Sequence, residues 1–65
     1  MSLEEKILDL FQKKEGIDTS NLIVSLPDDF DESYSCEIME QEDNGKVWTI
    51  QLNSKLTRIV DIYEL

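Results

Sequence analysis

The fold is decided by residues 34–52, which read YSCEIMEQEDNGKVWTIQL. On both sides of the dipeptide Asn44-Gly45, apolar and polar side chains alternate with the two-residue period of a half-buried strand. Asn-Gly is a frequent turn between two antiparallel strands. The segment therefore predicts a β-hairpin. Its apolar face is expected to carry Tyr34, Cys36, Ile38, Trp48, Ile50 and Leu52.

The length of the connection determines which residues of this hairpin face each other. A two-residue turn would place apolar residues opposite polar ones. A loop over residues 43–45, with Gly45 left-handed in a bulge, instead matches apolar with apolar, and we expect this three-residue loop. The pairs that it predicts are Ile38 with Ile50, Cys36 with Leu52, and Glu42 with Lys46.

Ahead of the hairpin, residues 3–15 predict an amphipathic helix. Ser2 and Glu5 have the spacing of an N-terminal capping box, and apolar residues then recur at helical intervals. Gly16 follows a basic last turn and is typical of the end of a helix.

Three shorter elements complete the expected fold. Residues 21–26 are rich in β-branched side chains and stop at Pro27, which predicts a short strand at an edge or a terminus. Residues 27–32 have room for one or two helical turns, and residues 56–63 predict a last strand. We therefore expect one α+β domain over residues 1–65, with the N-terminal helix packed on one face of an antiparallel sheet of about four strands.

Acidic residues dominate the middle of the chain. The sequence has fifteen Asp and Glu against six Lys and Arg, a net charge of −9, and no basic residue lies between Lys14 and Lys46. A solvated surface would explain such acids, but the lack of interspersed lysines favours a surface that resembles a polyanion. Seven acids are expected to form one contiguous negative face: Asp28, Asp29, Asp31, Glu32, Glu40, Glu42 and Asp43.

Composition excludes several classes of function. With no His, the chain has neither a Ser-His nor a Cys-His nucleophilic pair and no His-containing metal site. A chain of 65 residues is too short for a deep catalytic cavity beside a core, and its charge opposes nucleic-acid binding. Cys36 and Trp48 are expected in the core. We therefore expect a cytoplasmic, non-enzymatic protein without metal, cofactor or membrane-spanning segment.

The most distinctive segment is a short strand that runs directly into an acidic turn with one aromatic residue. The segment begins with residues 20–26, which contain the strand expected at 21–26, and residues 27–32 follow as PDDFDE. An exposed strand edge fits into a groove, where carboxylates can meet the Arg, Lys and N–H groups that otherwise hold DNA phosphates. A rigid strand of this kind can compete with DNA for the binding cleft of an enzyme.

These features resemble the phage-encoded uracil-DNA glycosylase inhibitors. The shared order is an N-terminal helix, an apolar strand, Leu26-Pro27, a run of acids around one apolar residue, and the late segment KVWTIQL at residues 46–52. The resemblance implies a DNA mimic that binds a host uracil-DNA glycosylase as a monomer, 1:1. In that family the first strand enters the DNA cleft, and an apolar pocket between sheet and helix receives a leucine of the enzyme.

Carried over by position, the resemblance assigns Asn21, Leu22 and Ile23 to the inserted strand. Asp29 and Glu32 stand at acidic contacts, and Ser25 and Phe30 at pocket positions. The expected partner-binding residues are Ser20, Asn21, Leu22, Ile23, Asp28, Asp29, Phe30, Asp31 and Glu32. The expected pocket residues are Val24, Ile38 and Ile50, with Phe30 and Leu22 beside them.

The sequence departs from the family and leaves other readings open. Asn21 lacks the charge of the family's glutamate, Ser25 is polar, and the chain is shorter. One alternative is a DNA mimic directed against a restriction or CRISPR nuclease. The other is a small PepSY-like interaction module, in which the acids are ordinary surface. Salt-sensitive binding to a DNA-handling enzyme is expected of both mimics and not of the PepSY-like module.

Overall fold

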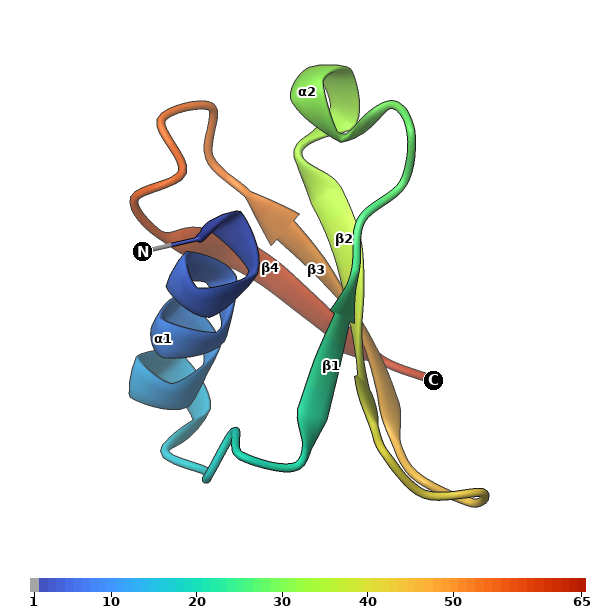
Figure 1. Ribbon diagram of the computed structural model, residues 1–65. Coiled ribbons are helices and arrows are strands. Elements are labelled where there is room, and N and C mark those ends of the chain that lie inside the picture. The colour runs from blue at the N-terminus through green and yellow to red at the C-terminus, as the bar shows by residue number, and fades with distance from the viewer. Residues whose placement is uncertain (1) are drawn as a thin grey trace.

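An N-terminal helix lies across one face of a four-stranded antiparallel sheet in the computed structural model, which describes residues 2–65 (Figure 1). The elements in chain order are α1 (Leu3–Glu15), β1 (Leu22–Ser25), α2 (Phe30–Ser33), β2 (Ser35–Glu40), β3 (Val47–Leu52) and β4 (Ile59–Glu64). The α+β arrangement predicted from the sequence is confirmed.

Local sequence signals determine the bounds of α1. The Ser2 hydroxyl accepts a hydrogen bond from the Glu5 N–H at 3.2 Å. At the other end, Gly16 is left-handed, with φ of 69°, and its N–H donates to the Gln12 C=O at 2.7 Å. Ile7 and Phe11, one turn apart, are buried against the sheet. The predicted range of residues 3–15 is confirmed.

The strands follow each other in chain order across the sheet, so β1 and β4 are its two edges. The strand predicted over residues 21–26 is found as β1, which covers Leu22–Ser25 and lies at an edge of the sheet. The sheet is twisted, and α1 contacts both edge strands (Figure 1).

The predicted register of the β2–β3 hairpin is wrong by two residues. Ile38 faces Trp48 and Cys36 faces Ile50. The Glu40 N–H donates to the Lys46 C=O at 3.0 Å, so residues 41–45 form a longer loop than the one expected. Because side chains alternate with a period of two, this shift leaves every predicted residue of β2 and β3 on its predicted face.

Close packing at Gly45 accounts for the longer loop. The Glu40 carboxylate folds back and accepts a hydrogen bond from the Lys46 N–H at 2.6 Å. A Cβ at position 45 would lie 2.6 Å from the Glu40 Cβ, so Gly45 is required for space and not for a left-handed conformation. The observed register therefore brings the Glu40 side chain against the backbone of Gly45 and Lys46.

The strands are shorter than expected: Asn21 and Leu26 lie outside β1, Tyr34 precedes β2, and residues 56–58 precede β4. Tyr34 ends α2 in the left-handed region, with φ of 54°, and its N–H donates to the Phe30 C=O at 2.8 Å. Leu56 is also left-handed, in a loop where the Asn53 carboxamide accepts the Thr57 N–H at 2.8 Å, so β4 begins at Ile59. At Thr57 a side-chain bond to the backbone stands where sheet pairing was expected. Tyr34 caps α2 through its backbone N–H, while its C=O still accepts a hydrogen bond from the Leu52 N–H at 2.8 Å.

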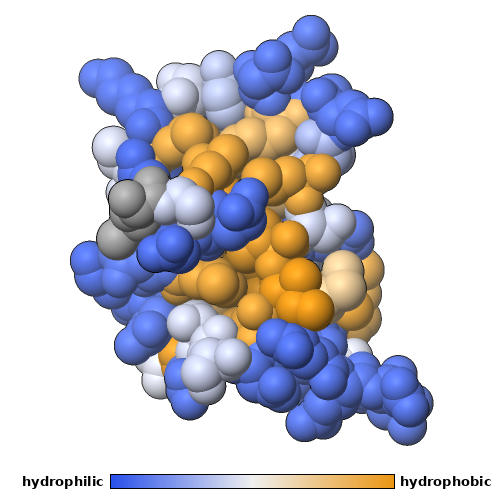
Figure 2. Space-filling model, viewed as in Figure 1, coloured by the Kyte–Doolittle hydropathy of each residue, from blue (hydrophilic) through white to orange (hydrophobic). Residues whose placement is uncertain are grey.

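The core lies between α1 and the sheet. Its buried residues are Ile7, Phe11, Leu22, Phe30, Cys36, Ile38, Trp48, Ile50, Leu52 and Ile59. Phe11 meets Trp48 edge to face, with ring centroids 5.1 Å apart. Seen from the side of α1, apolar surface gathers at the centre and hydrophilic residues surround it (Figure 2). Within residues 2–65 there is no helix of the length and apolar character that a membrane crossing requires.

Candidate functional site

The first part of the candidate site is the free edge of β1. The Gln41 N–H donates to the Asn21 C=O at 3.0 Å, which makes these two residues a hydrogen-bonded pair. Because such pairs alternate along an antiparallel ladder, Leu22 and Val24 direct their backbone groups away from β2. The Leu22 N–H donates instead to the Thr19 C=O at 3.1 Å. The Leu22 C=O and both backbone groups of Val24 therefore have no partner in the sheet.

Side chains on this strand divide between solvent and core. Ser20, Asn21 and Ile23 are exposed, with 46% of Ile23 accessible, and Val24 is half-buried. Leu22 is buried at 8% exposure. A partner that binds this edge would contact the exposed residues and the backbone. Leu22 instead packs in the core and holds the strand in place.

The second part is α2, which follows β1 at the end of the sheet (Figure 1). Phe30 is buried at 8% exposure and packs near Tyr34, with ring centroids 6.4 Å apart. This anchor holds the short helix against the core. The four acids around it are exposed: Asp28, Asp29, Asp31 and Glu32. Within residues 2–65 none of the four forms an ion pair, since the pair found there joins Lys13 to Asp9.

The expected single negative face divides into two groups. Asp28 to Glu32 lie at the α2 end of the sheet, whereas Glu42 and Asp43 lie at the β2–β3 hairpin, at the opposite end (Figure 1). The Asn21 carboxamide donates to the Glu42 carboxylate at 3.5 Å, so the hairpin group borders the start of β1. The expectation of one contiguous face is wrong, and acids instead border the two ends of β1.

The expected apolar pocket is occupied by the protein's own core. Ile38 and Ile50 both have 0% exposure, and Val24 packs against the same core cluster. Two cavities on the described surface, one beside Trp48 and one beside Ile59, are lined by other residues. In this structure these positions offer no opening to a partner's side chain, because the sheet residues pack directly against α1.

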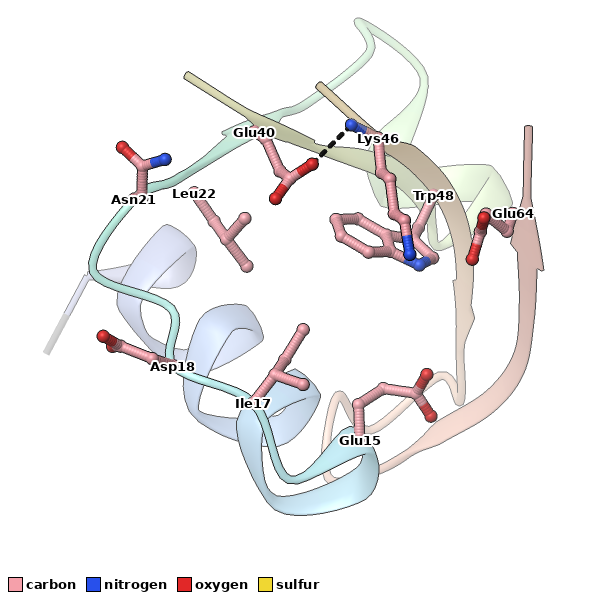
Figure 3. A pocket seen from close by; sticks show the side chains of 9 residues that line it. All are labelled: Glu15, Ile17, Asp18, Asn21, Leu22, Glu40, Lys46, Trp48 and Glu64. Atoms are coloured by element: carbon pink, nitrogen blue, oxygen red, sulfur yellow. Dashed lines mark hydrogen bonds between the residues drawn. The ribbon is translucent and has the colours of Figure 1, made fainter. Parts of the chain in front are cut away.

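A cavity of about 340 Å³ opens elsewhere, between the end of α1, the start of β1 and the strands β3 and β4 (Figure 3). The residues that line it are Glu15, Ile17, Asp18, Asn21, Leu22, Glu40, Lys46, Trp48 and Glu64. Of these, Asn21 and Leu22 were the ones expected to bind a partner. The cavity draws on segments far apart in the sequence, so no local motif indicates it.

The cavity combines an apolar centre with charged walls. Ile17, Leu22 and Trp48 lie toward its middle, and the carboxylates of Glu40 and Glu64 point inward from two strands (Figure 3). Asp18 stands at its margin, where it accepts hydrogen bonds from the Ser20 N–H at 3.0 Å and from the Ser20 hydroxyl at 2.9 Å. These bonds, first that from the Ser20 backbone and then that from its hydroxyl, lower the pKa of Asp18.

Cys36 offers no nucleophile. Burial, and secondarily the charge of Glu37, raise the pKa of its thiol to about 11, so the thiol stays protonated at neutral pH. Within residues 2–65 there is also no group of three or more His, Cys, Asp or Glu side chains placed to hold a metal ion. For recognition, the described surface offers carboxylates, free backbone groups and a partly apolar cavity.

Comparisons of this chain with protein families, with curated proteins and with solved structures find no match.

Proposed function

We propose that this protein is an acidic DNA mimic that inhibits a uracil-DNA glycosylase by occupying its DNA-binding cleft. The observation that carries the proposal is the junction of β1 and α2. There an exposed edge strand leads directly into four exposed carboxylates that have no ion-pair partner within the described residues. In this proposal the strand edge enters the cleft and the carboxylates take the positions of phosphates.

Charge complementarity supports this choice of partner. Enzymes that handle DNA hold its phosphates with Arg, Lys and backbone N–H groups, all of which form strong hydrogen bonds to carboxylates. A net charge of −9 on 65 residues also attracts a positively charged cleft over several ångströms and accelerates the encounter at low salt. The glycosylase in particular is proposed from the resemblance of residues 26–32 and 46–52 to its phage inhibitors.

The proposal assigns different tasks to the expected residues. Asp28, Asp29, Asp31 and Glu32 contact the partner through their carboxylates. Ser20, Asn21 and Ile23 contact it along the strand edge. Phe30 and Leu22 act indirectly, because their burial holds α2 and β1 in position.

Competition with DNA tests this function directly. A purified glycosylase is bound to a fluorescent duplex, and the protein is added at low and at high salt. We expect the protein to displace the duplex at low salt and to do so less effectively as salt rises, because screening weakens charge pairs. A duplex that stays bound at every protein concentration would contradict the proposal.

A mimic directed against another DNA-binding enzyme is the second candidate. The burial of Phe30, Ile38 and Ile50 favours it, because the apolar pocket that the glycosylase inhibitors use is closed here. Running the same displacement experiment with a restriction nuclease and a CRISPR nuclease separates the two. If the protein displaces DNA from one of these nucleases and not from the glycosylase, that nuclease is the target.

A further inference from the structure

We propose that the cavity between α1 and the sheet binds an arginine side chain of a partner protein. The cavity lies beside the edge of β1, and its volume of about 340 Å³ is near the lower end of the roughly 300–1,000 Å³ range of ligand pockets. A space of this size suits one long side chain better than a larger cofactor or a folded segment.

The centre of the cavity fits the aliphatic part of such a side chain. Leu22 and Trp48 are 8% and 6% exposed, so they are held firmly in the core and present one face to the cavity. Ile17, at 38% exposure, adds an apolar wall from the segment after α1. Methylene groups placed among these three side chains would lose contact with water, which favours binding.

The walls fit a positive charge. Glu15, Glu40 and Glu64 bring carboxylates to the cavity from α1, β2 and β4. The cation among the lining residues is Lys46, so the walls have an excess of negative charge. A neutral apolar ligand would remove water from these carboxylates without replacing their hydrogen bonds, whereas a cation compensates for that loss.

Arginine fits better than lysine or a second copy of this chain. A guanidinium is planar, weakly hydrated and able to donate to several carboxylates at once. A second copy would bring another net charge of −9 against this surface. Arginine binding at this cavity does not require that the partner is a glycosylase. Any enzyme that holds DNA phosphates with arginines presents a guanidinium that the cavity could bind.

The test uses N-acetyl-arginine amide as the ligand and the single Trp of the chain as the reporter. The Trp48 indole N–H resonance is followed by NMR during titration of the full-length protein. The control ligands are N-acetyl-citrulline amide, which has nearly the same shape without the charge, and N-acetyl-leucine amide. We expect the arginine derivative alone to shift the resonance, with a Kd on the order of millimolar for so small a ligand.

Two variants connect the response to the cavity. Glu15→Gln combined with Glu64→Gln should weaken arginine binding by roughly two- to tenfold, in keeping with the loss of two partly exposed ion pairs. Glu4→Gln, on the first turn of the same helix and outside the cavity, should bind like the parent. An equal response to citrulline or leucine amide, or no response to the arginine derivative at tens of millimolar, would overturn the proposal. This titration contains no glycosylase. Its outcome therefore does not decide whether the protein inhibits that enzyme, which the DNA displacement experiment tests separately.

Discussion

Among single residues, the carboxylates of α2 are those whose loss should weaken partner binding most. Asp29 and Glu32 are exposed, and within the described residues neither forms an ion pair. Charge-assisted hydrogen bonds in a desolvated cleft contribute about 1.5–3 kcal/mol each. We expect Asp29→Ala or Glu32→Ala to weaken glycosylase binding by about tenfold or more, measured by surface plasmon resonance. Glu4→Ala is the control, and equal binding by all three variants and the parent would mean that the α2 acids only solubilise the protein.

Cys36 gives a prediction about pH. The unfolded thiol titrates near its ordinary pKa of 9.0, while burial and Glu37 raise the pKa in the folded protein to about 11. Below pH 9 both states hold the proton, and between pH 9 and 11 only the folded state keeps it. The free energy of unfolding should therefore fall as pH rises through this window. Urea unfolding of Cys36→Ala should show a smaller decrease, and an identical slope in both proteins would contradict the raised pKa.

At the scale of elements, α2 depends on a single buried side chain. Phe30→Ala should lower the free energy of unfolding by about 3 kcal/mol or more, because it empties part of the core. Phe30→Leu, which keeps most of the volume, should cost less than about 1.5 kcal/mol and remain folded. Ile23→Ala is the exposed control, with a change within about 0.5 kcal/mol. Urea titration measures all three, and a Phe30→Ala protein as stable as the parent would mean that α2 is not anchored by this ring.

The hairpin loop gives the second prediction at this scale. A Cβ at position 45 would lie 2.6 Å from the Glu40 Cβ and 3.1 Å from the Glu40 carbonyl oxygen. Gly45→Ala should therefore displace the loop and lower the free energy of unfolding by about 1–3 kcal/mol. Asn44→Ala, at an exposed position in the same loop, should change it by no more than about 0.5 kcal/mol. If the two variants unfold at the same urea concentration, the close approach to Glu40 does not restrict the loop.

Elements whose signals are local in the sequence were predicted correctly, and those that depend on distant contacts were not. The bounds of α1 follow from Ser2 and Gly16, which act within one turn of the residues they cap. The faces of β2 and β3 follow from their alternating pattern. The hairpin register was not predicted: the loop is longer than the Asn-Gly preference indicates, and across it the Glu40 side chain bonds to the Lys46 backbone, a contact that no local pattern indicates. Tyr34 was placed in a strand because its local pattern continues that of Cys36, whereas capping of α2 decides its conformation.

The candidate site was only partly predictable for a related reason. Exposure of an edge strand and of the acids after Pro27 follows from local composition, and both are found. Cavities depend on how distant segments meet. Ile38 and Ile50 looked suitable for a pocket because they are apolar, but α1 covers them, and the cavity opens instead beyond the end of α1, where Trp48 meets Ile17.

At the scale of the whole molecule, two acidic groups border the ends of one free strand edge, and the core holds that edge in a fixed conformation. Self-repulsion among these acids opposes folding, and the fold tolerates it. We propose that this arrangement replaces DNA in the cleft of a glycosylase, with the α2 acids as the principal contacts.

Inhibition of uracil excision is the direct test of this proposal. Release of uracil from a labelled duplex is measured while the protein is titrated against a fixed amount of glycosylase. The parallel titration uses a variant neutralised at the α2 end: Asp28→Asn, Asp29→Asn, Asp31→Asn and Glu32→Gln. We expect the parent to stop excision at near-equimolar amounts and the neutralised variant not to stop it. Unchanged excision at a tenfold molar excess of the parent, or equal inhibition by both proteins, would contradict it.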